Sequence, residues 1–323
     1  MIIEKFNELD KLVPYLNKKE KDLIYEALQF SNKAHENQLR ESGEPFILHP
    51  IEVSKILISI KLDADSIVAG LLHDTVEDTK LTFSDIKKKF GNQISELVEG
   101  LTKISTYSLK ANKQKSGENY RKLLLAATSD LRVILIKLAD RLHNMRTIHF
   151  IKEENKKTKI ALETLEVFAP LAQRLGMKEW QDELEDISFE IINPDAKKTI
   201  IERLEYLKSK DDNIVDGIRY ELKKIFFQED LFCKVEGRIK SPYSIWNKIK
   251  NKNISFEQLS DIMAFRVITN STRECYRCLG IIHRQYPYIQ GRFKDFISAP
   301  KSNGYRALHT SVMGPKNKKI EIQ

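Results

Sequence analysis

The sequence has few cysteines and no long hydrophobic run. Three of its 323 residues are cysteine, too few for the disulfide framework of a small secreted domain. No apolar stretch approaches the ~20 residues that a membrane-spanning helix needs. The opening MIIEKFNELDKL is amphipathic and acidic, unlike a signal peptide. We therefore expect a cytoplasmic protein without a membrane segment.

The cysteines include one CxxC pair, Cys275 and Cys278, with His283 nearby. Such a pair can bind zinc or carry redox chemistry, but no second CxxC accompanies it. The alternative, which we favour, is two small side chains three positions apart on a helix.

Charge is unevenly distributed along the chain. The net charge is +8 overall, −3 over residues 1–195 and +11 over 196–323. A basic half attracts polyanions, either nucleic acid or nucleotide phosphates. A lysine-rich solvated surface explains the same charge, so sequence motifs are needed to distinguish the two possibilities.

Hydrophobic periodicity predicts an α+β protein in two parts. The first part is helical, and residues 105–119 are expected to form a loop. Its expected helices are 19–35, 51–60, 65–78, 84–91, 92–101, 120–148, 156–175 and 177–190. After Asn193-Pro194 the pattern changes, and strands appear beyond residue 230. The strands expected are 231–239, 262–268, 293–299, 307–314 and 319–323, with helices at 242–252 and 273–285.

Two polar stripes interrupt the apolar helices of the first part. One contains His73, Asp74, Glu77 and Asp78, which share a face if 65–78 is one helix. The other contains Asp140, Asn144 and Thr147. Ionisable groups that enter a core need a metal ion, a partner or a function.

A third helix begins near His49, which follows the turn SGEP. His49, His73, Asp74 and Asp140 would form a mixed nitrogen and oxygen ligand set that suits manganese, iron or a similar divalent ion. The alternative is a set of buried polar residues satisfied at helix junctions.

The strings AHENQLRESGEPFILHP, GLLHDTVEDT and IKLADRLHNMRT resemble the hydrolase domain of the Rel/SpoT family, whose members make and destroy the alarmone (p)ppGpp. The resemblance implies an all-helical HD-type hydrolase domain over 1–195 and a mixed α/β, nucleotidyltransferase-like synthetase domain over 196–323. It implies hydrolysis of (p)ppGpp to GDP or GTP and pyrophosphate.

The resemblance also implies residue roles at the hydrolase site. His49, His73, Asp74 and Asp140 would hold Mn²⁺. Glu77 and Asp78 would be catalytic, and Arg40, Asn144 and Thr147 would bind the nucleotide. Glu41 departs from the family, in which a basic residue is common at that place.

The second part carries cations and carboxylates on its expected strands and on the segments between them. Arg238, Lys240 and Lys248 can neutralise a triphosphate, and Asp261 and Glu321 can hold a magnesium ion if their strands are neighbours. A basic RNA-binding sheet would look similar.

This part resembles the Rel/SpoT synthetase domain, which transfers pyrophosphate from ATP to GDP or GTP. Residues 292–295 match the RxKD form of bifunctional members. Two departures are Phe296, where tyrosine is common, and Ser241-Pro242, where a histidine-containing pair is usual. The implied roles are Mg²⁺ binding and catalysis by Asp261 and Glu321, and substrate binding by Arg238, Lys240, Lys248, Lys294, Lys301, Asn303, Tyr305 and His309.

The sequence ends at Gln323, inside an expected strand. We therefore expect an incomplete synthetase sheet in which Glu321 is poorly supported. The expected partners are ppGpp, pppGpp, GDP, GTP and ATP, with no specific nucleic acid, no membrane and no ribosome contact. Two alternatives to a bifunctional enzyme are a hydrolase with a non-functional synthetase remnant and a nucleotide-binding regulatory fragment without turnover.

Overall fold

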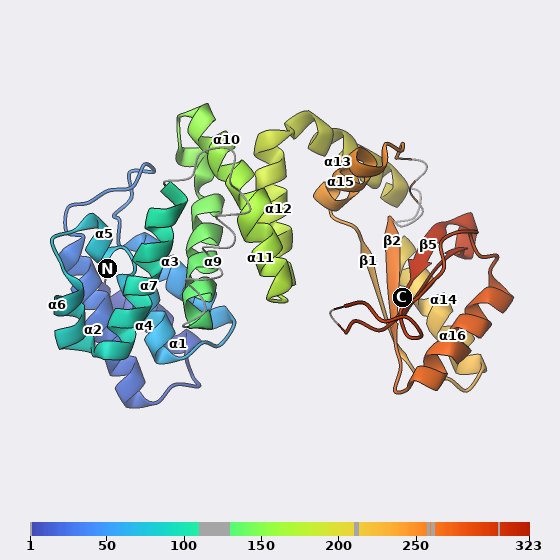
Figure 1. The fold of residues 1–323 in the computed structure, drawn as a ribbon, viewed down its shortest axis with the longest axis horizontal. Helices are drawn as coiled ribbons and strands as arrows, with labels where there is room; N and C mark the ends of the chain where they lie inside the picture. Colours follow the sequence, from blue (N-terminus) through green and yellow to red (C-terminus); the bar gives the residue numbers. More distant parts are fainter. Residues whose placement is uncertain (1, 110–129, 210–212, 257–258, 260–261, 303) are drawn as a thin grey trace. The chain divides into compact units, whose positions relative to one another are not determined.

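The computed structural model describes residues 2–109, 130–209, 213–256, 259, 262–302 and 304–323. These residues form two compact units, Met1–Ile192 and Asn193–Gln323, which Figure 1 colours from blue to red along the chain. The first unit is helical and the second contains a mixed sheet. The α+β class predicted from the sequence is confirmed.

The described residues of the first unit form a series of helices. They are α1 (Ile2–Leu12), α2 (Lys18–Ala34), α3 (Leu48–Ser59), α4 (Ala64–Leu72), α5 (Thr75–Asp78), α6 (Phe83–Phe90), α7 (Asn92–Leu109), α9 (Leu131–Arg146), η1 (Ile148–Phe150), α10 (Glu154–Glu163), the π-helical turn η2 (Thr164–Phe168), α11 (Ala169–Arg174) and α12 (Lys178–Ile192).

Capping side chains mark where several of these helices begin. Asn17 and Glu20 form a reciprocal capping box at α2, and Thr82 and Asp85 form another at α6. Such boxes satisfy backbone N–H groups that the first helical turn leaves without partners. The side chain of Asp130 accepts from the backbone N–H of Arg132, so α9 begins at Leu131.

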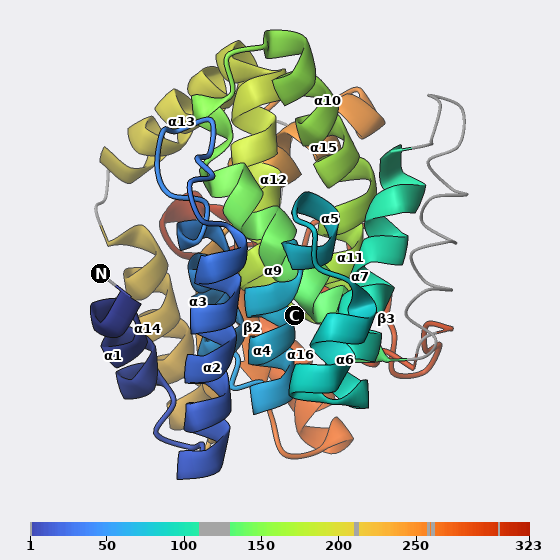
Figure 2. The same cartoon turned by 90° about the vertical axis from the view of Figure 1, so that its left-hand side faces the viewer.

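The apolar helices α3, α4 and α9 pack against one another in the core of the first unit (Figure 2). Gly70 allows α3 and α4 to approach closely. A Cβ atom at this position would lie 2.7 Å from Leu57 Cδ1, closer than real Cβ contacts. This packing brings the start of α3, the end of α4 and the middle of α9 together.

Three predicted helices and one predicted loop in the first unit differ from the structure. The expected helix 65–78 is divided into α4 and α5, because the side chains of His73 and Thr75 bond to the carbonyls of Gly70 and Leu72 and compete with the helical ladder. The expected loop 105–119 is wrong as far as Leu109, since residues 105–109 contain no glycine or proline that would end the helix.

The remainder of that loop lies outside the described residues. Within the expected helix 120–148, the described part starts α9 only at Leu131, and residues 120–129 lie outside the described part of the chain. The expected helix 156–175 contains the π-helical turn η2, followed by Pro170 in the first turn of α11.

The second unit combines helices with a five-stranded sheet. Its elements are α13 (Pro194–Ser209), α14 (Ile214–Gln228), β1 (Lys234–Ile239), α15 (Pro242–Lys252), β2 (Met263–Ile268), α16 (Thr272–Gln285), β3 (Lys294–Asp295), β4 (Leu308–Met313), η3 (Pro315–Asn317) and β5 (Lys319–Ile322). The helices α13 and α14 were not among the predicted segments.

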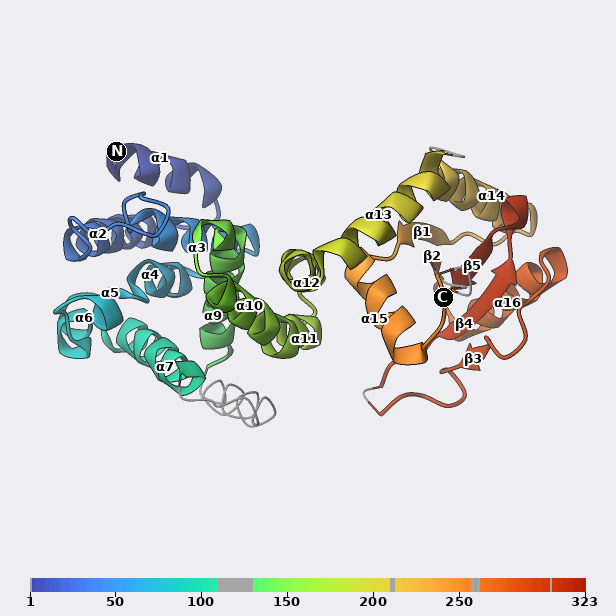
Figure 3. The same ribbon diagram turned by 90° about the horizontal axis from the view of Figure 1, so that it is seen from above.

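The helices α14 and α16 pack against the sheet (Figure 3). On α14 the buried residues Ile214, Ile218, Leu222 and Phe226 recur every four positions, which gives the helix one apolar face. This face shares a hydrophobic core with strand residues such as Val312.

Strand β5 lies in the middle of the sheet, whose order is β1-β2-β5-β4-β3. It pairs in parallel with β2 and antiparallel with β4, so Glu321 stands opposite Ala264 on one side and Ser311 on the other. The expectation that Glu321 is poorly supported is therefore wrong. Pairing on both sides holds the backbone of this last strand.

The expected strand 293–299 is also wrong beyond Asp295. The carboxylate of Asp295 accepts from the backbone N–H groups of Ile297 and Ser298, both at 2.9 Å. Such an aspartate turn bends the chain out of the sheet, which limits β3 to two residues. None of the described helices is both long and apolar enough to cross a membrane.

Candidate metal centre

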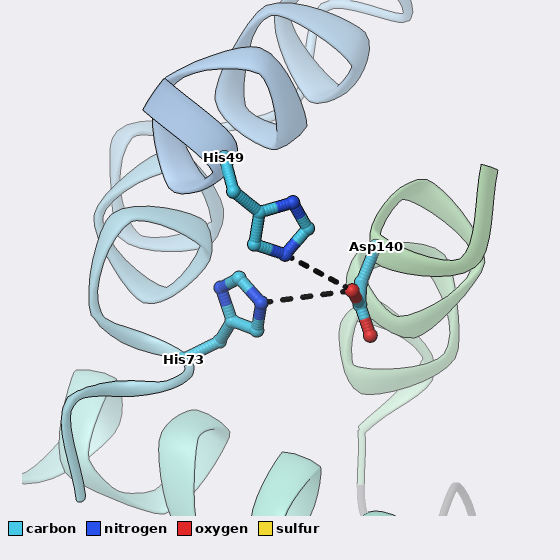
Figure 4. Close-up of side chains that lie close together, drawn as sticks. All are labelled: His49, His73 and Asp140. Carbon is cyan, nitrogen blue, oxygen red and sulfur yellow. Dashed lines mark ion pairs between the residues drawn. The ribbon is translucent and has the colours of Figure 1, made fainter. Parts of the chain in front are cut away.

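Three helices bring a histidine, a second histidine and an aspartate to one place. His49 stands in the first turn of α3, His73 follows the last residue of α4, and Asp140 lies on α9. One nitrogen of each imidazole and one oxygen of Asp140 all lie within 4.8 Å of one another. Figure 4 shows both imidazoles directed at the same carboxylate oxygen.

Asp74 extends this cluster with a second carboxylate. Its Oδ2 atom lies 3.1 Å from His73 Nε2 and 3.6 Å from His49 Nε2. Asp140 Oδ1 lies 3.8 Å and 3.2 Å from the same two nitrogens. At a bond length of about 2.1 Å, neighbouring ligands of an ion are about 3 to 3.5 Å apart and opposite ligands about 4.2 Å. The separations of 3.1 to 3.8 Å lie within the range that one shared ion allows.

The tautomer of His73 supports the same conclusion. Its Nδ1 atom lies 2.8 Å from the carbonyl oxygen of Gly70, which can only accept, so Nδ1 carries a proton in the neutral ring. Its Nε2 atom is buried and makes no hydrogen bond with the described residues. A lone pair facing two carboxylates in a buried place requires a cation, either a proton or a metal ion.

Electrostatics keep both carboxylates ionised. Burial alone would raise the pKa of Asp74, but His73 outweighs it and the pKa falls to about 2. Burial would likewise raise the pKa of Asp140, but Lys137, whose Nζ lies 2.7 Å from Asp140 Oδ2, holds it well below the usual range.

The two imidazoles differ in their electrostatics. Burial would lower the pKa of His73, but Asp74 and then Asp140 outweigh it and raise it to about 10. Burial lowers the pKa of His49, which leaves that ring neutral. Without a metal ion, His73 therefore carries a proton on Nε2 that a bound ion would have to displace.

A second set of side chains supports the cluster. Asn144 donates to Asp140 Oδ1 at 2.6 Å and accepts from Arg40 at 2.7 Å. Arg40 also lies 3.2 Å from His143 Nδ1, which is 2.7 Å from His49 Nδ1. Burial, followed by the charges of His49 and Arg40, lowers the pKa of His143 to about 3, so this ring is neutral.

The sequence analysis missed Lys137 and His143. A lysine inside the apolar run VILIKLA, three residues before Asp140, was a readable sign of a buried cation. His143 lies three residues after Asp140 and hence near the same helix face. Its contact with His49 joins residues far apart in the sequence, which no local pattern indicates.

The other hydrolase residues expected from the sequence lie around the cluster. Glu77 and Asp78 are exposed on α5, and Gln38 donates to the backbone carbonyl of Asp78 at 3.0 Å. Burial, and then the charge of Asp74, raise the pKa of Asp78. Thr147 caps α9, and its hydroxyl bonds to the carbonyls of His143 and Asn144.

Glu41, where the sequence departs from the Rel/SpoT pattern, forms an ion pair with Lys156 at 2.6 Å on the surface of the first unit. The cysteine pair carries no metal cluster among the described residues, where only His49, His73 and Asp140 form such a group. Cys275 contacts Thr269, and Cys278 is buried in the core.

In the second unit, aromatic and charged side chains gather around the β4–β5 pair. His309 lies 2.8 Å from the Tyr305 hydroxyl through Nε2 and 3.3 Å from Glu321 through Nδ1. Lys301 stacks over the rings of Phe296 and Tyr305, at 4.6 and 5.0 Å. The structure brings four predicted residues together here: Lys301, Tyr305, His309 and Glu321.

The remaining predicted synthetase residues are dispersed or outside the described part. Arg238 and Lys294 are exposed on β1 and β3. Lys240, between β1 and α15, and Lys248, within α15, are partly buried. Asp261 and Asn303 lie outside the described residues. Phe296, a departure from the family, fills the space beside Tyr305 and His309 with an apolar ring.

Comparison with family models matches residues 27–178 to the HD domain and 237–323 to the region found in RelA and SpoT proteins. The chain is 45% identical over 301 residues to GTP pyrophosphokinase rsh of Brucella melitensis, covering 93% of this chain and 40% of that protein. It is 41% identical over 319 residues to the bifunctional (p)ppGpp synthase/hydrolase SpoT of Escherichia coli, covering 98% and 45%.

Among solved structures, a metazoan orthologue of SpoT that hydrolyses ppGpp matches with 28% identity and a TM-score of 0.42, covering 52% of this chain and 94% of that one. The chain spans less than half the length of the two curated relatives. An HD domain implies a divalent metal ion, and His49, His73 and Asp140 can hold one.

Proposed function

The chain belongs to the Rel/SpoT family, and from that premise we propose that it hydrolyses (p)ppGpp to GDP or GTP and pyrophosphate. We propose Mn²⁺ as the metal, held by His49, His73, Asp74 and Asp140. The observation that carries the proposal is the convergence of two buried imidazoles on the buried carboxylate of Asp140, with the carboxylate of Asp74 3.1 Å from His73 Nε2 and 3.6 Å from His49 Nε2.

When bound there, the metal ion would polarise a phosphoryl oxygen and increase the acidity of water. Water then attacks the phosphorus next to the 3′ oxygen, the bond to that oxygen breaks, and pyrophosphate leaves. We assign the transfer of the proton from water to the 3′ oxygen to Asp78, with Glu77 beside it. The raised pKa of Asp78 suits a group that must both accept and donate a proton.

We assign nucleotide binding to Arg40, Asn144 and Thr147. The guanidinium of Arg40 is partly buried beside the cluster, where a phosphate would meet less competition from water. Asn144 contacts both Arg40 and Asp140 and so fixes the distance between the guanidinium and the proposed metal ligand.

The test is turnover of ppGpp by the purified chain. With Mn²⁺ we expect equal amounts of GDP and pyrophosphate, and chelation should stop the release. Asp74→Asn keeps the size of the side chain but removes its charge, and should abolish release while the thermal unfolding transition remains cooperative. Asp22→Asn, an exposed aspartate on α2, is the matched control and should behave as the wild type.

A second activity, the synthesis of (p)ppGpp from ATP and GDP or GTP, is favoured by the cluster of Lys301, Tyr305, His309 and Glu321. The relatives named GTP pyrophosphokinase and (p)ppGpp synthase/hydrolase support it. We propose that Tyr305 stacks on guanine and that Lys301, Asn303, His309 and Lys294 surround the nucleotide.

For the phosphate donor, we propose ATP contacts by Arg238, Lys240 and Lys248 and Mg²⁺ binding by Asp261 and Glu321. Incubation of the Asp74→Asn variant with ATP, GDP and Mg²⁺ separates synthesis from hydrolysis. Formation of ppGpp would support the second activity. If no ppGpp forms, the second unit of this chain is inactive in synthesis and hydrolysis is its one activity.

A further inference from the structure

Adjacent residues of α9 connect one arginine to two proposed metal ligands. Arg40 Nη1 lies 3.2 Å from His143 Nδ1, and Arg40 Nη2 lies 2.7 Å from Asn144 Oδ1. His143 in turn contacts His49, and Asn144 contacts Asp140. His143 has no role in the function proposed above.

These contacts determine the tautomer of each ring. Arginine has donors and no acceptor, so the Nδ1 atom of His143 that faces it must carry a lone pair. His49 Nδ1, only 2.7 Å from that lone pair, must then carry the proton. In a neutral ring this leaves the lone pair of His49 on Nε2, the atom that faces Asp74 and Asp140.

The positions of the two imidazoles explain why only His49 needs a side-chain partner. The ring of His73 follows the end of α4, where helix carbonyls lack partners, and its Nδ1–H bonds to the carbonyl of Gly70. His49 stands in the first turn of α3, where the free backbone groups are N–H donors. No free carbonyl of its own helix end is available there to accept the Nδ1–H.

We propose that His143 is a positioning residue that fixes His49 in the Nδ1–H tautomer required for metal binding, and that Arg40 holds His143 in its accepting state. This inference rests on the proposed metal-dependent function. Without an acceptor at position 143, His49 can carry its proton on Nε2 and donate to Asp140, 3.2 Å away. That tautomer has no lone pair to offer the metal ion.

Two substitutions of His143 distinguish the positioning role from simple packing. His143→Asn can place a carbonyl oxygen near the position of Nδ1, whereas His143→Leu fills similar space without an acceptor. Loss of a partner that orients a metal ligand typically weakens metal binding 10- to 100-fold. We expect a loss of this size in the dissociation constant of Mn²⁺ for His143→Leu, and a change of about threefold or less for His143→Asn.

Metal affinity is measured by titration of Mn²⁺ into the 323-residue chain of each variant, with the thermal transition recorded alongside. His149→Leu, at an exposed histidine six residues away, is the control and should bind as the wild type. A folded His143→Leu chain that binds Mn²⁺ as tightly as the wild type would overturn the inference. Equal losses in the Asn and Leu variants would also overturn it, because the accepting atom would then be irrelevant.

Nitrogen NMR of the wild type decides the question even if the Leu variant does not fold. In the chain labelled with ¹⁵N-histidine and loaded with diamagnetic Zn²⁺, we expect the proton of His49 on Nδ1 and that of His143 on Nε2. A proton on Nδ1 of His143 would refute the proposal. A wild type that binds no metal ion would reject the proposed function itself, whereas normal turnover with unchanged affinity in His143→Leu would reject only the role of His143.

Discussion

Metal binding should displace one proton, and that proton should come from His73. Asp74 and Asp140 remain ionised near neutral pH because their pKa values are lowered, and His49 is neutral because burial lowers its pKa. Only His73, with a pKa raised to about 10, is protonated in the metal-free cluster. Its Nε2 atom cannot bind a metal ion until that proton leaves.

The free-energy cost of displacing this proton follows from the same pKa. One pKa unit corresponds to about 1.4 kcal/mol, so at pH 7 the proton opposes metal binding by about 4 kcal/mol. Because the pKa of His73 is raised in the fold, its protonation stabilises the metal-free chain below pH ~6.5, and this contribution is lost as pH rises toward about 10. Over that window the affinity for Mn²⁺ should increase about tenfold per pH unit.

Calorimetry checks this prediction directly. Mn²⁺ is titrated into the chain at pH 7 in two buffers that differ in ionisation enthalpy, and the difference in heat gives the protons released. We expect about one proton per ion, and the same value for the control His149→Leu. Release of no proton, or an affinity that is flat between pH 6.5 and 8.5, would refute the charge assignment of the cluster.

Three further substitutions test other parts of the structure. Gly70→Val places a branched side chain against Leu57 and should lower the free energy of unfolding by about 1–3 kcal/mol. An unchanged urea midpoint would contradict the close packing of α3 on α4. Asp78→Asn should reduce kcat for ppGpp hydrolysis by about 10²–10⁴-fold, with little change in the affinity for Mn²⁺. A normal kcat would show that Asp78 has no part in catalysis. Tyr305→Phe keeps the aromatic ring but loses the hydrogen bond to His309. If the chain synthesises ppGpp, the KM of this variant for the guanine nucleotide should rise by less than about tenfold. A larger rise in KM would mean that the hydroxyl rather than the ring binds the nucleotide.

The sequence was informative wherever a chemical signal was local. His73 and Asp74 stand out because they are ionisable groups at the end of an apolar helix, and Asp140 because it interrupts another. Helical spacing also placed Asn144 next to Asp140, and the two are in contact. The two-part α+β organisation followed from the break at Asn193-Pro194 and from the strands expected beyond residue 230.

Features that depend on distant contacts could not be read in this way. The sequence predicted β5 as an unsupported terminal strand, although it pairs with β2 and β4 at the centre of the sheet. Strand order is set by non-local pairing, which hydrophobic periodicity does not contain. The contact between His49 and His143 joins α3 to α9, and it depends on how these two helices pack in the fold.

The same distinction applies to the break between α4 and α5. Periodicity predicted one helix over 65–78, and the hydrogen bonds that divide it come from the side chains of His73 and Thr75. The break directs Nε2 of His73 toward Asp74 and Asp140 while Nδ1 bonds to the carbonyl of Gly70. A local departure from helical regularity therefore occurs where the proposed ligand is positioned.

Metal occupancy and ppGpp turnover can be measured on the same sample. Mn²⁺ is titrated into the chain, the bound ion is counted by electron paramagnetic resonance, and the release of pyrophosphate from ppGpp is followed at each step. We predict that the rate rises in proportion to the occupancy of one site per chain, and that Asp140→Asn shows neither. Full turnover in the chelated chain, or in Asp140→Asn, would show that these residues do not hold the catalytic metal ion.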